Sequence, residues 1–283
     1  MKKLWIVTEL FYPEETSTAF ILTKIANALS DKFDVNVICG PESYGRAALE
    51  DNPSTKLSLD GRIKIHRVSN CNLNKDKIFT RLLRFLIIGF KLSFSLWKNA
   101  KKQDRVFIVT NPAPLLISVA LIKRIKKFPL YILVHDVFPE NTIPAGVISS
   151  DKTFGYKLLR KCFNWAYKSA DCLIVLGRDM RQIMKSKLGK NQNNTKIEII
   201  ENWAENDIAQ LNPVNKSKNI VIQYAGNIGR VQGLKSFIQQ YAEAMNPIVS
   251  LELWGDGAMR KELEEYAKEN DCLLYTSDAA DEA

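Results

Sequence analysis

The chain has 283 residues, of which 46% are hydrophobic and 25% are charged, and its formal net charge is +9. This composition excludes a largely disordered chain and a collagen-like one, and the length allows one large domain or two medium ones. Five cysteines without a C-x-x-C pair argue against a disulfide framework and favour a reducing compartment. The two histidines do not cluster with cysteines at metal-ligand spacing, so we expect no metal site.

The positive charge is concentrated in two places. Residues 75–102 hold eight basic residues and one acidic residue, and residues 123–127 read KRIKK. Both stretches adjoin apolar segments, which suits a lipid headgroup or another anionic ligand better than a long nucleic acid duplex. We therefore expect an anionic membrane surface as a partner and no nucleic acid. Two solvated helix faces remain the plainer alternative.

The first two hundred residues alternate strand and helix patterns. Buried strands are predicted at 4–9, 34–39, 62–68, 105–110, 129–135, 172–176 and 196–200. Helices are predicted between them, at 17–30, 77–100, 113–127, 152–170 and 178–188. Continuous apolar strands separated by helices predict a parallel sheet covered on both faces.

The helix at 77–100 has a wider apolar surface than packing on one sheet requires. Its cations fall on one narrow stripe: Lys77, Arg81, Arg84, Lys91 and Lys98. We expect the excess apolar surface to lie in a lipid interface, with the basic side chains reaching headgroups. A helix buried on two sides by its neighbours is the alternative. No segment reaches the ~20 apolar residues of a membrane span and no cleavable signal peptide is evident, so we expect a cytoplasmic protein, peripheral at the inner membrane face.

A polar stretch at 202–218 has no sustained period and indicates an interdomain linker. The pattern then restarts, with strands at 219–226 and 249–255 and helices at 235–245 and 258–269. This predicts two doubly wound domains, 1–201 and 219–272, facing a cleft, with ligands beyond the C-terminal strand ends. Because 219–272 hold only about two βα repeats, we expect the second domain to be incomplete. Residues 273–283 are small and acidic, and we expect a non-native tail there.

The most specific motif is YAGNIGRVQGLK, at 224–235, which follows a strand and opens a helix. Gly226 and Gly229 let the backbone approach a ligand, and the helix start offers free N–H groups and a positive dipole end. Arg230 and Lys235 add two cations, so the motif predicts a diphosphate clamp. A glycine-rich turn with solvated cations is the alternative. Neither G-x-G-x-x-G nor a P-loop pattern occurs.

The same segment resembles the donor-phosphate loop of retaining glycosyltransferases of family 4, which have the GT-B fold of two Rossmann-like domains. Further segments agree with the family in order: residues 9–30, VHDVFPE at 134–140, ADCLIVLGRDM at 170–180, ENW at 201–203 and WGDG at 254–257. The resemblance covers roughly residues 1–272 and is nearest to bacterial polysaccharide and O-antigen members.

The resemblance implies a site for a nucleotide diphosphate sugar, with UDP preferred to GDP. Its expected donor-binding residues are Gly226, Asn227, Gly229, Arg230, Lys235, Gly255, Asp256 and Gly257. His135 and Asp136 follow a strand's C-terminal end and are the expected catalytic residues. His135 would contact the donor sugar or position the acceptor hydroxyl, and Asp136 would orient His135 or contact the acceptor. A satisfied strand-end histidine beside a turn-capping aspartate is the alternative.

The expected acceptor-side loop contains Glu14, Glu15, Thr16 and Ser17. Threonine and serine there also suit an N-cap for the helix at 17–30, and both roles can hold at once. Two departures from the family stand out: Ala19 occupies a common glycine position, and the family's glutamate pair, separated by seven residues in the C-terminal half, has no counterpart.

No Asp-x-Asp pair occurs, so we expect a metal-free transfer without a cofactor, in which Arg230, Lys235 and the helix dipole neutralise the leaving diphosphate. The expected reaction moves a sugar from a nucleotide diphosphate sugar to a lipid-linked or polysaccharide acceptor with retention of configuration. Two alternatives stay open. One is a UDP-sugar 2-epimerase of the same architecture, and the other is a catalytically inactive, membrane-associated sugar-nucleotide-binding protein.

Overall fold

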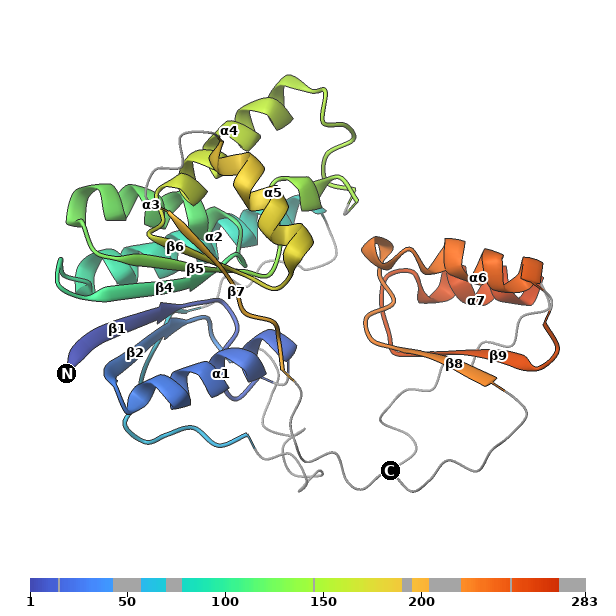
Figure 1. Cartoon of the computed structure of the whole chain (residues 1–283), viewed down its shortest axis with the longest axis horizontal. Helices are drawn as coiled ribbons and strands as arrows, with labels where there is room; N and C mark the ends of the chain where they lie inside the picture. Colours follow the sequence, from blue (N-terminus) through green and yellow to red (C-terminus); the bar gives the residue numbers. More distant parts are fainter. Residues whose placement is uncertain are drawn as a thin grey trace. The chain divides into compact units, whose positions relative to one another are not determined.

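A computed structural model shows the chain as two compact units (Figure 1). The residues that it describes are 1–14, 16–42, 57–69, 78–144, 146–189, 195–203, 220–244 and 246–269. The first unit contains Met1–Asn141 and Ser150–Trp203, and the second contains Thr142–Ser149 and the described part of Ala204–Ala283. Most of the expected linker and all of the expected tail lie outside the described residues.

The first unit is built on a seven-stranded parallel sheet with the strand order β3-β2-β1-β4-β5-β6-β7. Its strands are β1 (Lys2–Val7), β2 (Phe33–Cys39), β3 (Lys64–Arg67), β4 (Arg105–Val109), β5 (Leu130–Val134), β6 (Cys172–Val175) and β7 (Lys196–Ile199). Each matches its predicted strand to within two residues, so the predicted parallel sheet is confirmed. The strand order reverses between β1 and β4, the kind of switch point where such sheets bind ligands.

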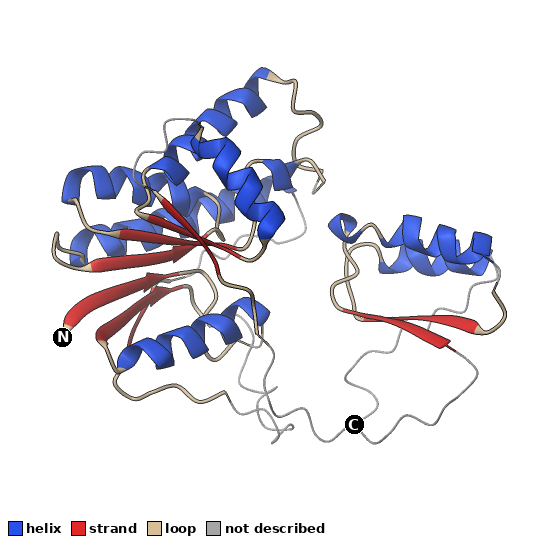
Figure 2. Cartoon of the chain, viewed as in Figure 1, coloured by secondary structure: helices blue, strands red, loops and turns tan. Residues whose placement is uncertain are grey.

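Helices cover both faces of this sheet (Figures 1 and 2). They are α1 (Ser17–Ser30) on one face, and α2 (Ile78–Asn99), α3 (Pro114–Lys126), α4 (Phe154–Lys168) and α5 (Arg178–Leu188) on the other. Because alternate residues of a strand point to opposite faces, each strand contributes to two cores. Leu4 and Ile6 of β1 pack with Leu22 of α1. Trp5 and Val7 join the larger core beneath α2 to α5.

One side of α2 faces solvent. Ile88 and Leu92 are buried in the core, whereas Leu86, Phe90 and Phe94 are 56%, 68% and 48% exposed. The rings of Phe90 and Phe94 stack with their centroids 6.2 Å apart. The expected excess of apolar surface on this helix is therefore confirmed for its described side chains.

Two cations of the expected headgroup-binding stripe on α2 have partners within the first unit, and the expected lipid contact stays a prediction. Arg84 pairs with Glu9 at 3.4 Å, and Lys91 donates to the backbone oxygen of Ser69 at 2.9 Å. Both cations therefore bind loops of the first unit itself. Lys98 lies over the ring of Phe94 at 4.8 Å. Lys77 and the side chain of Arg81 lie outside the described residues.

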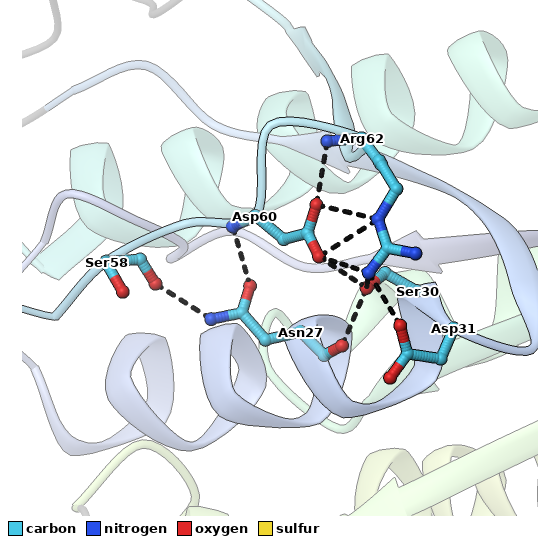
Figure 3. A network of polar contacts seen from close by, with 6 residues as sticks. All are labelled: Asn27, Ser30, Asp31, Ser58, Asp60 and Arg62. Atoms are coloured by element: carbon cyan, nitrogen blue, oxygen red, sulfur yellow. Dashed lines mark hydrogen bonds and ion pairs between the residues drawn. The ribbon is translucent and has the colours of Figure 1, made fainter.

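A polar clasp joins the C-terminal end of α1 to the segment before β3 (Figure 3). The Nη2 atom of Arg62 lies 2.6 Å from both Asp31 Oδ1 and Asp60 Oδ2. The backbone N–H of Asp60 donates to Asn27 Oδ1 at 3.0 Å, and Asn27 Nδ2 donates to the oxygen of Ser58 at 2.7 Å. Hydrogen bonds from Arg62 hold the pKa of Asp60 well below its usual range. The clasp thus fixes α1 against the β3 edge of the sheet.

The second unit contains a parallel pair of strands, β8 (Ile220–Ala225) and β9 (Val249–Trp254). The helices α6 (Leu234–Ala244) and α7 (Arg260–Glu269) pack on one face of this pair, and the short helix η4 (Arg230–Gln232) precedes α6. A small core of Ile228, Ile238, Leu251 and Leu253 lies between them. The predicted restart of the βα pattern is therefore confirmed. Among the helices that the structure describes, none has both the length and the apolar character of a membrane span.

Candidate active site

The first candidate group lies at the C-terminal end of β5, where His135 and Asp136 follow the strand directly. Thr110, at the end of β4, is fully buried and accepts hydrogen bonds from the backbone N–H groups of both residues, at 3.1 and 2.9 Å. The side chain of Asn141 donates to Asp136 Oδ1 at 3.0 Å. Thr110 and Asn141 thus fix the backbone of both residues and the carboxylate of Asp136.

Burial sets the charge of this pair. It lowers the pKa of His135 and raises that of Asp136, and in each case the charge of the neighbour opposes the shift. Burial therefore favours the neutral imidazole at neutral pH. Its Nε2 atom is buried and has no hydrogen-bond partner among the described residues. Because buried polar atoms are normally paired, this nitrogen is suited to a hydroxyl of a bound ligand.

A buried lysine braces the loop that follows His135 and Asp136. The side chain of Lys187 is 2% exposed, and its Nζ donates to the backbone oxygen of Phe138 at 3.0 Å and to the carboxylate of Glu140 at 2.6 Å. The Tyr167 hydroxyl accepts the Phe138 N–H at 3.2 Å. Burial lowers the pKa of Lys187, while its hydrogen bond to Glu140 opposes this. Sequence reasoning missed this brace, and its only signal is a lysine on the core face of α5, beside Leu188.

The acceptor-side loop leads into α1. Thr16 is the N-cap of that helix, its Oγ1 accepting the Ala19 N–H at 3.3 Å, and Ser17 is the first helical residue. Glu14 is only 3% exposed. The capping interpretation of Thr16 is therefore confirmed, whereas an acceptor role for this loop stays a prediction. Glu15 lies outside the described residues.

Arg67 ties together the C-terminal ends of β1, β2 and β3, and sequence reasoning did not single it out. From β3 it donates to the backbone oxygen of Tyr12, after β1, at 2.6 Å and to that of Gly40, after β2, at 3.3 Å. A Cβ at Gly40 would lie 2.7 Å from the backbone oxygen of Glu9, so these loops are in close backbone contact. A cation at the end of a short strand is the only sequence signal for this contact.

The second candidate group consists of the loops that follow β8 and β9. Their backbones are hydrogen-bonded to each other: the Gly226 N–H donates to the Trp254 oxygen at 2.8 Å, and the Ile228 N–H to the Asp256 oxygen at 2.9 Å. The two loops therefore form one rigid edge at the C-terminal ends of the strand pair. The expected donor residues from 226–230 and 255–257 all lie on this edge.

Two glycines of this edge have no room for a side chain. A Cβ at Gly255 would lie 2.0 Å from the oxygen of Gly226, and one at Gly257 would lie 2.3 Å from the oxygen of Ile228. Their φ angles, +138° and +159°, also disfavour any other residue. The glycines of the WGDG motif are thus required for the contact between the loops.

The expected cations of the clamp lie in different surroundings. Arg230 is exposed at the start of η4, and Gly233, in the left-handed conformation with φ +67°, leads into α6. Lys235 instead pairs with Glu262 of α7 at 3.0 Å and stands over the Tyr266 ring at 5.1 Å. The side chain of Lys235 therefore joins α6 to α7, and the contact was not foreseen from the sequence.

The remaining donor residues are also placed on the loop after β8. The backbone oxygen of Asn227 accepts the Tyr224 hydroxyl at 2.9 Å. A Cβ at Gly229 would lie 2.9 Å from Asn227 Nδ2 and 2.7 Å from Gln232 Oε1, so this turn is also tight. Within the described ranges, no group of three or more His, Cys, Asp or Glu side chains could hold a metal ion.

Comparison with known proteins identifies the family. The profile of Glycosyltransferase Family 4 matches residues 21–207. The chain belongs to glycosyltransferase family 4. This family 4 chain is 32% identical to the probable glycosyltransferase WbjE of Pseudomonas aeruginosa, over 96% of its own length and 67% of the relative. The expected family membership is confirmed.

Two solved glycosyltransferase structures resemble this family 4 chain. One is the apo form of the lipopolysaccharide outer core galactosyltransferase WaaB, with 15% identity and a TM-score of 0.57, covering 99% of this chain and 69% of that one. The other is Anabaena HepE in complex with UDP and glucose, with 17% identity and a TM-score of 0.61, covering 99% and 70%. These likenesses concern the fold, and they confirm the expected α/β class of GT-B type.

Proposed function

We propose that this family 4 chain transfers a sugar of hexose or N-acetylhexosamine type from a nucleotide diphosphate sugar to a polysaccharide or lipid-linked acceptor. The observation that carries the proposal is the rigid edge of the second unit. There, two loops are joined backbone to backbone, and the loop after β8 leads into the start of α6. Free N–H groups at a helix start, together with the exposed Arg230, suit the diphosphate of such a donor.

UDP is the proposed nucleotide. The solved structures of HepE with UDP and with UDP-glucose support this choice, because that protein shares the fold of this chain. The description of WaaB as a lipopolysaccharide outer core galactosyltransferase supports a cell-surface glycan as the acceptor.

The proposed reaction retains the anomeric configuration and needs no metal ion. The bond between the anomeric carbon and the diphosphate breaks, the acceptor oxygen bonds to that carbon, and the acceptor proton passes to the leaving phosphate oxygen. Arg230 and the N-terminal end of α6 would stabilise the charge that develops on the diphosphate. His135 would contact the donor sugar or position the acceptor hydroxyl, and Asp136 would orient it. The absence of an Asp-x-Asp pair from the sequence supports a metal-free leaving group.

We further propose that the protein works at the inner face of the cell membrane. The exposed Leu86, Phe90 and Phe94 of α2 support an interfacial contact, because a soluble helix rarely presents so many large apolar side chains on one side. Since Arg84 and Lys91 have partners within the first unit, we expect further cations elsewhere on its surface to meet anionic lipid.

Titration of UDP into the purified chain tests the donor site. Arg230→Ala should weaken UDP binding by about 10- to 100-fold, because a charge-assisted hydrogen bond contributes about 1.5–3 kcal/mol. Arg181→Ala, which removes an exposed arginine from α5, is the matched control and should bind UDP as the wild type does. Equal affinities for all three proteins would contradict the assignment of the donor site.

A further inference from the structure

A basic cavity lies at the N-terminal ends of the strands of the first sheet, whereas His135 lies at their C-terminal ends. It has a volume of about 400 Å³ and is lined by Ala120, Lys123, Arg124, Lys127, Phe128, Pro129, Trp165, Ser169 and Asp171. Pro129 immediately precedes β5 and Asp171 immediately precedes β6, so the cavity lies at the N-terminal ends of these strands. His135 follows the C-terminal end of β5, about 17 Å away along a five-residue strand. The cavity is therefore separate from the candidate active site.

The charges around the cavity leave two cations for a ligand. Lys123 pairs with Asp171, and the same carboxylate oxygen accepts the Leu130 N–H at 2.6 Å. The negative charge of Asp171 is thus engaged within the protein. Arg124 and Lys127 are exposed at the mouth of the cavity. The negative end of the α3 dipole favours cationic side chains in the last turn of that helix, but it does not explain a cavity walled by Phe128 and Trp165.

Exposed apolar side chains lie on α3, whose last turn and C-cap hold the two cations, and on the neighbouring α2. Leu121 and Ile125, one turn apart on α3, are 52% and 65% exposed. Trp97 of α2 is 38% exposed, and its backbone oxygen accepts a hydrogen bond from Lys126. Exposed apolar residues interleaved with cations are typical of surfaces that enter the lipid interface. A soluble ligand would leave Leu121 and Ile125 in water.

We propose that this cavity binds the phosphate of an anionic phospholipid headgroup while Leu121 and Ile125 enter the surrounding lipid. The guanidinium of Arg124 offers a fork of donors to two phosphate oxygens, and the ammonium of Lys127 adds a second positive charge. The proposal rests on the membrane contact of the proposed function and deepens it by assigning the headgroup site to α3 and α4. It also adds two cations, Arg124 and Lys127, to those of α2.

Cosedimentation with phospholipid vesicles tests the site. The test variant is Arg124→Gln with Lys127→Gln. The matched control is Arg181→Gln with Lys185→Gln, which removes the same charges from the exposed side of α5. Vesicles of phosphatidylcholine alone are compared with vesicles that also contain phosphatidylglycerol. The test variant should lose about thirty-fold in affinity for the anionic vesicles, because each cation at an anionic surface contributes about fivefold. The control should lose less than about threefold, because its charges do not line the cavity.

Three outcomes would overturn the headgroup site. Equal losses in the two variants would mean that charge acts diffusely, and unaltered vesicle binding by the test variant would remove the cavity from the contact. Tight binding of inorganic phosphate in equilibrium dialysis, lost in the test variant, without vesicle binding would assign the cavity to a soluble phosphate. Thermal melts confirm that each variant is folded. UDP titration of the same preparations reports the donor site separately, so failure of the cavity and failure of the proposed transfer are distinguishable.

Discussion

For His135, the sequence predicted the position at a strand end but not the contacts that hold the loop after it. Its place at a strand end followed from the apolar run that it terminates, and the structure bears this out. The contact between Lys187 and Glu140 that braces its loop could not be foreseen. The two residues are 47 positions apart, and the sequence does not distinguish a buried lysine from an exposed one. The contact of Lys235 with Glu262, 27 residues further on, could not be foreseen either, and the donor role of Lys235 stays a prediction.

The lowered pKa of His135 leads to a prediction about the pH dependence of transfer. Its usual pKa is 6.5, and burial moves it downwards, so the neutral form persists as the pH falls below 6.5. The kcat of transfer should therefore stay constant through pH 6.5 and fall only at lower pH. His135→Gln should lower kcat by about a hundredfold, the scale of lost acid–base or hydroxyl positioning, and should remove this acid limb.

The control for this prediction is His66→Gln, which alters the other histidine of the chain, on β3, and should leave kcat unchanged. Rates are measured over pH values from about 5 to 8, where histidine titrates. An acid limb centred above pH 6.5, or one that survives in His135→Gln, would show that another group controls the rate.

At the scale of elements, hydrophobic periodicity predicted the helices and strands well because the central strands β1, β2, β4 and β5 are largely buried on both faces. The long helix α2 shows where this reasoning stops. Its exposed apolar side followed from the width of its apolar surface, but the partners of Arg84 and Lys91 come from the loops after β1 and β3. Periodicity within one helix contains no information about the loops that lie beside it.

The clasp between α1 and β3 gives a prediction for this scale. Asp60→Asn should lower the Tm by a few degrees at pH 7, because the amide loses the charge-assisted hydrogen bonds to Arg62. The folded-state pKa of Asp60 lies below the unfolded value of about 3.9, so its contribution is complete above that pH and is lost as the pH falls further. The Tm difference from the wild type should therefore shrink below about pH 4.

Asp31→Asn is the matched comparison for the clasp. Asp31 makes one contact with Arg62, at 2.6 Å, whereas Asp60 accepts hydrogen bonds from its backbone N–H, Nε and Nη2. Asp31→Asn should therefore lower the Tm by less than Asp60→Asn does. Thermal melts of the three proteins across the acid range decide the matter. A Tm difference for Asp60→Asn that is independent of pH would refute the electrostatic origin of the effect.

For the molecule as a whole, the alternation of strands and helices and the set of family-like segments predicted the fold class. The candidate sites were predictable in part. The loop glycines follow a recognisable motif, although the structure assigns Gly255 and Gly257 to contact between loops. The headgroup cavity was not predictable as a cavity, because its walls come from α3, α4 and the segments before β5 and β6. The KRIKK sequence revealed only that charge gathers there.

The most direct test of the central claim is transfer of radiolabel from a panel of UDP-hexoses and UDP-N-acetylhexosamines to a bacterial membrane extract in excess EDTA. We expect label in the lipid-extractable or polysaccharide fraction, unaffected by EDTA. Arg230→Ala should reduce the rate by about a hundredfold, because it removes a charge that stabilises the leaving diphosphate, and Arg181→Ala should not. UDP binding without labelled acceptor, epimerised UDP-sugar without labelled acceptor, or activity that is lost in EDTA and restored by Mn²⁺ would contradict the account.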